Sequence, residues 1–142
     1  MSVVLVIGAS SGIGLETARR ALAAGFAVRA MARSKPPLKA SSGALEIASG
    51  DALDSAAVAA ALTGVDAVIQ TLGLGSLGRL GTVTLFSQAT RILIAAMQAQ
   101  SIRRLVSVTG FGAGDSRRAM PWLQRVPFEL ALGRAYADKS EQ

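Results

Sequence analysis

The 142-residue sequence contains neither cysteine nor histidine, and this excludes several kinds of chemistry. Without cysteine there is no disulfide framework, no thiol nucleophile and no thiolate ligand for a metal ion. Without histidine the chain lacks the usual general base and the most common metal ligand. Any acid–base step must use lysine, tyrosine, a carboxyl group or a hydroxyl, and we predict no metal site.

Long apolar runs are also missing. The first one, Val3 to Ile7, is too short for a membrane span or for the apolar part of a signal peptide, and no basic segment precedes it. No other stretch approaches the ~20 apolar residues that a membrane helix needs. We therefore predict a cytoplasmic protein with no membrane partner.

Acidic residues are few relative to basic ones, 9 against 15, which gives a formal charge of +6. Such a balance can indicate nucleic-acid binding. Here, however, most basic residues are scattered, and no aromatic residues are interleaved with the few Arg-Arg pairs. A polyanionic cofactor and ordinary solubility explain the charge more simply, and we predict no nucleic-acid partner.

Helical and extended patterns alternate along the chain. With 51% hydrophobic and 17% charged residues the chain is not disordered, and its length suits one domain over residues 1–142. Strands are expected at residues 2–7, 26–31, 45–47, 65–71 and 102–109, and helices at 13–24, 54–62, 85–97 and within 122–142. This alternation predicts an α/β Rossmann fold, a doubly wound parallel sheet with strand order 3-2-1-4-5.

A glycine-rich turn, GASSGIG, follows the first predicted strand and opens the first predicted helix. Gly8 permits the tight turn, Gly12 removes a Cβ where a pyrophosphate comes close, and Gly14 lets the helix pack on the sheet. Free N–H groups and the helix dipole would hold the anion, unless the turn binds nothing. The candidate cofactor residues are Gly8, Ala9, Ser10, Ser11, Gly12, Ile13 and Gly14.

The residue that follows the second strand distinguishes NADP from NAD. An acidic residue about 20 positions after the turn would bind the ribose hydroxyls of NAD. Here that position is Arg33, followed by Ser34, and no acidic residue lies between Gly25 and Gly43. Arginine binds phosphate through two nitrogens, so we predict NADP(H) rather than NAD(H). The alternative is that Arg33 is a solvated loop residue.

Several segments together resemble a known family. They are GASSGIG, Ala32-Arg33, GDALD at residues 50–54, GVDAVIQTLG, VSVTGFGAGDSR and the terminal YADK. They are similar to the NAD(P)H-binding, NmrA-like group of atypical short-chain dehydrogenases/reductases, which has biliverdin/flavin reductases and NAD-dependent epimerases among its relatives. The resemblance implies that Asp51 and Ala52 lie by the adenine, although Asp51 could also cap a helix. It implies that the backbone of Thr71, Leu72 and Gly73 passes beneath the cofactor.

The resemblance is weakest at the catalytic residues. The main branch of the superfamily uses a serine after the fifth strand and a Tyr-x-x-x-Lys motif on the next helix. Here Gly110 stands at the serine position, with Thr109 immediately before it, and Tyr136 precedes Lys139 by three residues rather than four. Thr109, Tyr136 and Lys139 are the catalytic candidates. Tyr136 could equally be a packing aromatic, and Lys139 a solvated lysine.

Two classes of function stay open. One is an NADP-dependent oxidoreductase that transfers hydride to a small-molecule substrate such as a flavin, quinone or enone. The other is a non-catalytic NADP-binding module or redox sensor. Relatives continue past residue 142 with a sixth strand and a substrate-covering region. We therefore expect the fifth strand to be an apolar edge that recruits a second copy, giving a homodimer or higher oligomer.

Overall fold

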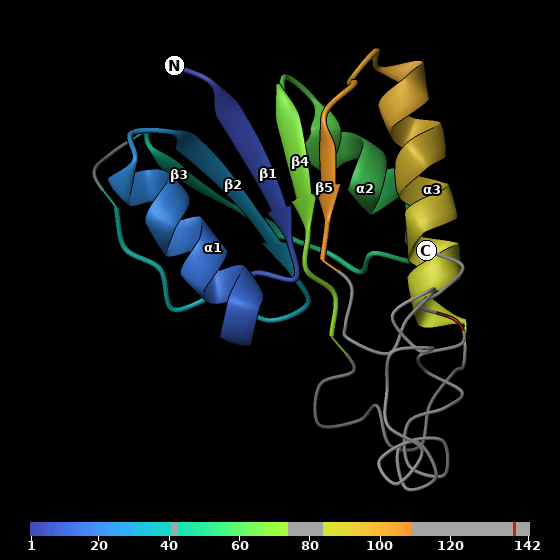
Figure 1. The fold of residues 1–142 in the computed structure, drawn as a ribbon, viewed down its shortest axis with the longest axis horizontal. Helices are drawn as coiled ribbons and strands as arrows, with labels where there is room; N and C mark the ends of the chain where they lie inside the picture. The colour runs from blue at the N-terminus through green and yellow to red at the C-terminus, as the bar shows by residue number, and fades with distance from the viewer. Residues whose placement is uncertain (41–42, 74–83, 109–137, 139–142) are drawn as a thin grey trace, which may run out of the picture. The chain divides into compact units, whose positions relative to one another are not determined.

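The computed structural model describes residues 1–40, 43–73, 84–108 and 138. Strands and helices alternate along this part of the chain (Figure 1). The elements are β1 (Val3–Ile7), α1 (Gly12–Ala23), β2 (Ala27–Ala32), β3 (Leu45–Ser49), α2 (Ser55–Leu62), β4 (Ala67–Gln70), α3 (Leu85–Ala99) and β5 (Leu105–Ser107).

The strands form one parallel sheet in the order β3-β2-β1-β4-β5, which confirms the predicted order. In its centre, Val4 of β1 lies opposite Val28 of β2 on one side and Ala67 of β4 on the other. The chain leaves β1 toward β2 and later returns to β1's other side as β4. Ligands of open parallel sheets bind at the carboxyl ends of the strands where the order reverses in this way.

The central strands are continuous apolar runs because both of their faces are covered. Leu5, Val6 and Val68 have no exposed surface. The edge strands are less buried, and Val106 of β5 is 60% exposed. The core therefore lies along β1, β2 and β4, and it holds rigid the strand ends at which a ligand would bind.

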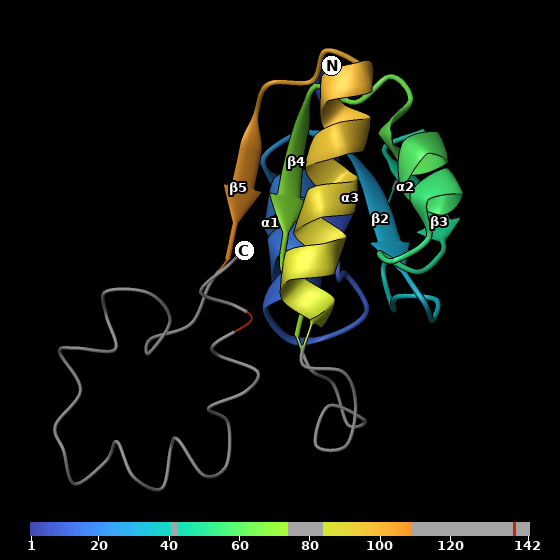
Figure 2. The same ribbon diagram turned by 90° about the vertical axis from the view of Figure 1, so that its right-hand side faces the viewer.

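The helices lie on both faces of the sheet (Figures 1 and 2). Helix α1 covers one face and buries Gly14 and Ala18 against it. Helix α2 and the last part of α3 lie on the opposite face, and the side chain of Gln100 donates a hydrogen bond of 2.8 Å to the carbonyl oxygen of Ala59. These positions are those that right-handed β–α–β crossovers produce.

The main difference from the predicted boundaries lies before β5. We expected that strand from residue 102, but the Ile102 N–H donates to the carbonyl oxygen of Met97 and so ends α3. Ser101 adopts a left-handed conformation, with φ 58°, which makes this helix end possible. The strand begins only at Leu105, where pairing with β4 starts.

The chain divides into two compact units, and the prediction of a single domain stays a prediction. One unit is Met1–Gly73 with Ile92–Val108. In the other, the structure describes residues 84–91 and Asp138, which is helical. There the Asp138 carboxylate accepts hydrogen bonds from the N–H groups of Phe86, at 2.6 Å, and Ser87, at 3.3 Å, and from the Ser87 hydroxyl. In the described part of the chain, no helix has both the length and the apolar character that a membrane crossing requires.

Candidate cofactor site

The glycine-rich turn joins β1 to α1 at the carboxyl edge of the sheet. The N–H groups of Gly8 and Ala9 both donate to the carbonyl oxygen of Met31 on β2, at 2.9 and 3.3 Å. These two amides therefore hold the turn against the sheet. They are not free to bind a ligand, although both residues were expected among the cofactor contacts.

Thr71 holds the turn from the other side. Its N–H and its hydroxyl both donate to the carbonyl oxygen of Ile7, at 2.9 and 2.8 Å. A Cβ on Gly8, which has a φ of 91°, would lie 2.7 Å from the Thr71 carbonyl oxygen. A Cβ on Gly14 would overlap the Gly8 carbonyl oxygen and the Thr71 hydroxyl. Glycine at these positions thus serves close packing, as predicted for Gly14.

The amino terminus of α1 is open. Ser11 is the N-cap residue, but its side chain makes no capping hydrogen bond. Within the described residues, the backbone N–H groups of residues 10–14 have no acceptor. Such groups carry the positive end of the helix dipole and are a ready binding site for phosphate.

Gly12 lies in the middle of this row of amides. It has a φ of 56°, and a Cβ built on it would meet nothing within 4 Å. Unlike Gly8 and Gly14, Gly12 is therefore not required by contacts within the described protein. The space beside it lets a ligand approach the backbone, and the site accordingly fits the pyrophosphate of a dinucleotide.

The residues after β2 and β3 lie at the same edge of the sheet, because all strands are parallel. Arg33 and Ser34 directly follow β2 and are exposed. No carboxylate pairs with Arg33 in the described part of the chain. After β3, the Asp51 side chain accepts a hydrogen bond of 2.9 Å from the Leu53 N–H, and Ala52 is buried. Asp51 thus has a local structural role, and its contact with adenine stays a prediction.

The end of β4 and the catalytic candidates complete the predicted site. Beyond the buried Thr71, Leu72 is half-buried and Gly73 is exposed. Thr109, Tyr136 and Lys139 lie outside the described residues, so their catalytic roles stay predictions. Asp138, beside Lys139, is the nearest described residue, and it caps α3.

Two parts of the site were not expected from the sequence. The Met31 carbonyl oxygen anchors the turn through the backbone, and no side-chain pattern marks such a role. The Thr71 hydroxyl links the end of β4 to the end of β1 through its hydrogen bond to the Ile7 carbonyl oxygen. This hydrogen bond could have been predicted, because Thr71 stands at the end of an apolar strand and a buried hydroxyl requires a hydrogen-bond partner.

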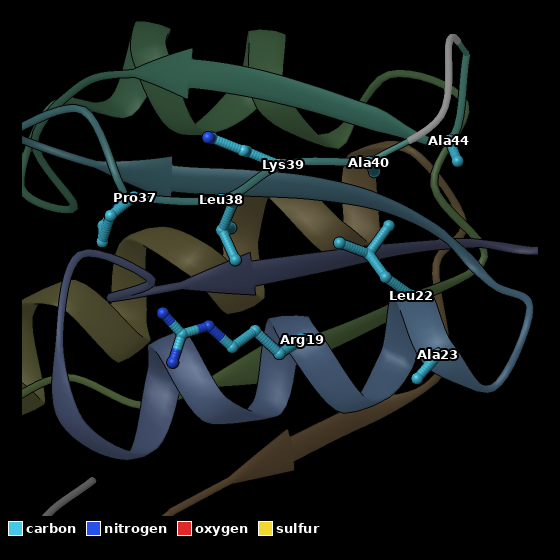
Figure 3. Close-up of a pocket in the computed structure, with 8 residues that line it drawn as sticks. All are labelled: Arg19, Leu22, Ala23, Pro37, Leu38, Lys39, Ala40 and Ala44. Atoms are coloured by element: carbon cyan, nitrogen blue, oxygen red, sulfur yellow. The ribbon is translucent and has the colours of Figure 1, made fainter.

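A pocket of about 540 Å³ lies between α1 and the segment that follows β2 (Figure 3). Its walls come from α1, from the segment that follows β2 and from the residue before β3. The lining residues are Arg19, Leu22, Ala23, Pro37, Leu38, Lys39, Ala40 and Ala44.

Comparison with solved structures shows the same fold in bacterial proteins. ChuY from E. coli CFT073 is 27% identical, with a TM-score of 0.75, and the match covers 99% of this chain and 63% of ChuY. ChuY from E. coli O157:H7, described as an anaerobillin reductase, is 26% identical with a TM-score of 0.74 over 99% of this chain and 64% of its own. The oxidoreductase ylbE from Lactococcus lactis is 17% identical with a TM-score of 0.75, over 99% of this chain and 60% of ylbE.

This chain therefore spans less than two thirds of each of these three proteins. A family model described as NAD(P)H-binding matches residues 8–142, which include the glycine-rich turn, the open amino terminus of α1 and the carboxyl ends of β2, β3, β4 and β5. The match to this model and the structural neighbours also confirm the resemblance to atypical short-chain reductases. The chain belongs to the NAD(P)H-binding family that this model describes.

Proposed function

We propose that this chain binds NADP(H) in preference to NAD(H) and serves hydride transfer to a small acceptor of the flavin, quinone or enone type. The observation that carries the proposal is the open amino terminus of α1, where the N–H groups of residues 10–14 have no acceptor among the described residues. Bound there, the cofactor would supply the hydride, and the protein would supply binding and orientation.

The preference for NADP(H) rests on the residues that follow β2. Arg33 lies where the adenosine ribose of a dinucleotide approaches the sheet, and Lys35 lies two residues on. Both are exposed cations without a carboxylate partner among the described residues. Such cations favour a 2′-phosphate, and they lack the carboxylate oxygens that accept hydrogen bonds from the ribose hydroxyls of NAD.

The reductase proposal has support from the comparisons and from chemistry. One structural neighbour is described as an anaerobillin reductase. A flavin or quinone acceptor can take its proton from water, so an incomplete serine–tyrosine pair does not prevent reduction. Lys139 and Tyr136 would orient the nicotinamide ribose and the substrate, with Thr109 as a hydroxyl donor near the acceptor.

A second candidate function is a non-catalytic NADP-binding module or redox sensor. Two differences from the main branch favour it. Gly110 replaces the serine, and Tyr136 precedes Lys139 by three residues rather than four. The two candidates are separated by following NADPH oxidation with flavin mononucleotide, a quinone or an enone as acceptor. Turnover with any of these supports the reductase, whereas tight NADPH binding without turnover supports the module.

Titration calorimetry with NADP⁺ and NAD⁺ tests the cofactor preference. We expect tighter binding of NADP⁺, and we expect Arg33→Ala to weaken it about tenfold or more, the range of a charge-assisted contact, without affecting NAD⁺. Arg103→Ala is the matched control, because Arg103 is an exposed arginine before β5, at the opposite edge of the sheet. Equal affinities of the unmutated protein for the two cofactors would refute the preference.

Cytoplasmic location and self-association stay predictions. In the described sheet β5 pairs with β4 alone, and its Val106 is 60% exposed. Apolar strand edges recruit further strands. Light scattering tests for the expected dimer, and a stable monomer at high protein concentration would refute it.

A further inference from the structure

The pocket beside α1 carries an inference that rests on the proposed binding of NADP(H). Its lining is apolar apart from the two cations Arg19 and Lys39, and it contains no carboxylate. Its floor includes Leu38, which is 8% exposed and belongs to the core cluster that α1 packs against. The segment that follows β2 is therefore fixed against α1, and the position of the pocket is set by the core.

The Arg19 side chain points toward the proposed cofactor site. In Figure 3 the side chain runs along α1 in the direction in which the strand arrows point, which is toward the carboxyl ends of the strands. Its guanidinium group lies toward the same end as Pro37. Side chains on a helix lean toward its amino terminus, so this direction is the normal one for Arg19. Pro37 follows Arg33 by four residues and lines the same pocket. The guanidinium group thus lies at the end of the pocket nearest the carboxyl end of β2.

Within the described residues, no acidic side chain balances the charge around Arg19. Its neighbour Arg20 pairs with Glu16 at 2.8 Å, but Arg19 has neither a hydrogen bond nor an ion pair within the described residues. The same holds for Arg33, Lys35 and Lys39. Four cations therefore come from α1 and from the segment after β2, and no acidic side chain of the described chain neutralises them.

We propose that Arg19 is a second cation for the 2′-phosphate of NADP(H), acting from α1 while Arg33 acts from the end of β2. A phosphate monoester carries between one and two negative charges at neutral pH, so one arginine does not balance it. Arg19 and Arg33 would then enclose the phosphate from two elements of the fold. Arg19 is in this way a specificity-determining residue that discriminates NADP(H) from NAD(H).

Calorimetric titration of the full chain with NADP⁺, NAD⁺, 2′,5′-ADP and 5′-AMP tests this. Because Arg19 is exposed, we expect Arg19→Ala to weaken NADP⁺ and 2′,5′-ADP about fivefold, the upper end for an exposed ion pair, and to leave NAD⁺ and 5′-AMP unchanged. Arg19→Glu should have a larger effect on the same two ligands. Arg20→Ala is the control, since it removes an adjacent exposed arginine that Glu16 already engages, and it should change none of the four.

The double variant Arg19→Ala/Arg33→Ala sharpens the test. If both arginines contact one phosphate, their effects on NADP⁺ affinity will not multiply, because contacts to a shared group are coupled. In the double variant, the affinity for NADP⁺ should fall to the affinity for NAD⁺.

The outcomes separate this inference from the proposed function. If the unmutated protein prefers NADP⁺ and Arg19→Ala keeps the full preference, the function stands and the role of Arg19 is wrong. If Arg19→Ala weakens NADP⁺ and NAD⁺ equally, Arg19 acts on a part that both share, and the inference is also overturned. If the unmutated protein shows no preference, the NADP part of the proposed function fails, and the inference fails with it.

Discussion

The amino termini of the three described helices are treated in different ways. Helix α2 is closed by its own N-cap residue, since the Asp54 side chain accepts from the N–H groups of Ala56 and Ala57 at 2.9 and 3.2 Å. Helix α3 is closed by Asp138, a residue distant in sequence. Helix α1 has Ser11 as its N-cap residue, and within the described part of the chain no side chain caps it.

The three helix ends differ in whether a carboxylate of the described residues satisfies their N–H groups. Every helix begins with N–H groups that lack an intrahelical acceptor, and proteins normally satisfy them. This chain does so at α2 and α3 with a carboxylate. At α1, no described residue accepts from the N–H groups of residues 10–14, and the space beside Gly12 is open. A phosphate would do for α1 what the carboxylates do for the other two helices.

The largest expected effect comes from filling the space in front of α1. Gly12→Ala should weaken NADP⁺ binding at least about tenfold, because a methyl group would push the pyrophosphate from several N–H groups, each worth ~1.5–3 kcal/mol. Gly25→Ala is the matched control. Gly25 also has a positive φ, 86°, and also has nothing within 4 Å of a built Cβ, but it lies at the other end of α1. Equal loss of NADP⁺ affinity in both variants, measured by calorimetry, would mean that only backbone strain matters.

The next effect concerns the remote cap of α3. Asp138→Ala would remove the carboxylate that accepts from the Phe86 N–H and from the N–H and hydroxyl of the buried Ser87, so we expect a loss of about 2–3 kcal/mol in the free energy of unfolding. Urea denaturation measures it. Asp138→Asn keeps an acceptor and should lose less. Gln98→Ala, a substitution at an exposed position, is the control. If Asp138→Ala lowers the free energy of unfolding no more than Gln98→Ala does, the cap is not important for stability.

The smallest effects compare the caps of α2 and α1 in the absence of cofactor. Asp54→Ala removes two hydrogen bonds and should cost about 1 kcal/mol of unfolding free energy. Ser11→Ala removes no capping bond and should stay within about 0.5 kcal/mol. If thermal or urea unfolding shows the two variants to be equally destabilised, α1 is not open in the sense described here.

Much of the fold was predictable because its signals are local. The apolar run Val3–Ile7, the turn that follows it and the spacing of Ala18 and Leu22 determine a strand, a turn and a helix that packs on it. The start of α2 was predictable as well, because Asp54, the first residue of the helix expected over 54–62, caps α2 with a side chain that bonds within three residues. The strand order followed from the handedness of crossovers.

The remaining features depend on contacts between distant parts of the chain. The anchoring of the turn by Met31 and Thr71, and the cap of α3 by Asp138, join residues that no sequence spacing brings together. The direction of the Arg19 side chain likewise depends on how α1 packs against the segment after β2. Sequence reasoning placed the candidate cofactor site at the correct turn, but it did not identify the groups that hold this turn in position.

The most direct test of the open helix end is a backbone amide NMR titration with NADP⁺. We expect the largest shift changes at residues 10–14 and further changes at Arg33, while the amides of Ala56 and Ala57 at the capped start of α2 stay unchanged. Binding of NADP⁺ that leaves residues 10–14 unshifted, or that shifts the start of α2 equally, would contradict it.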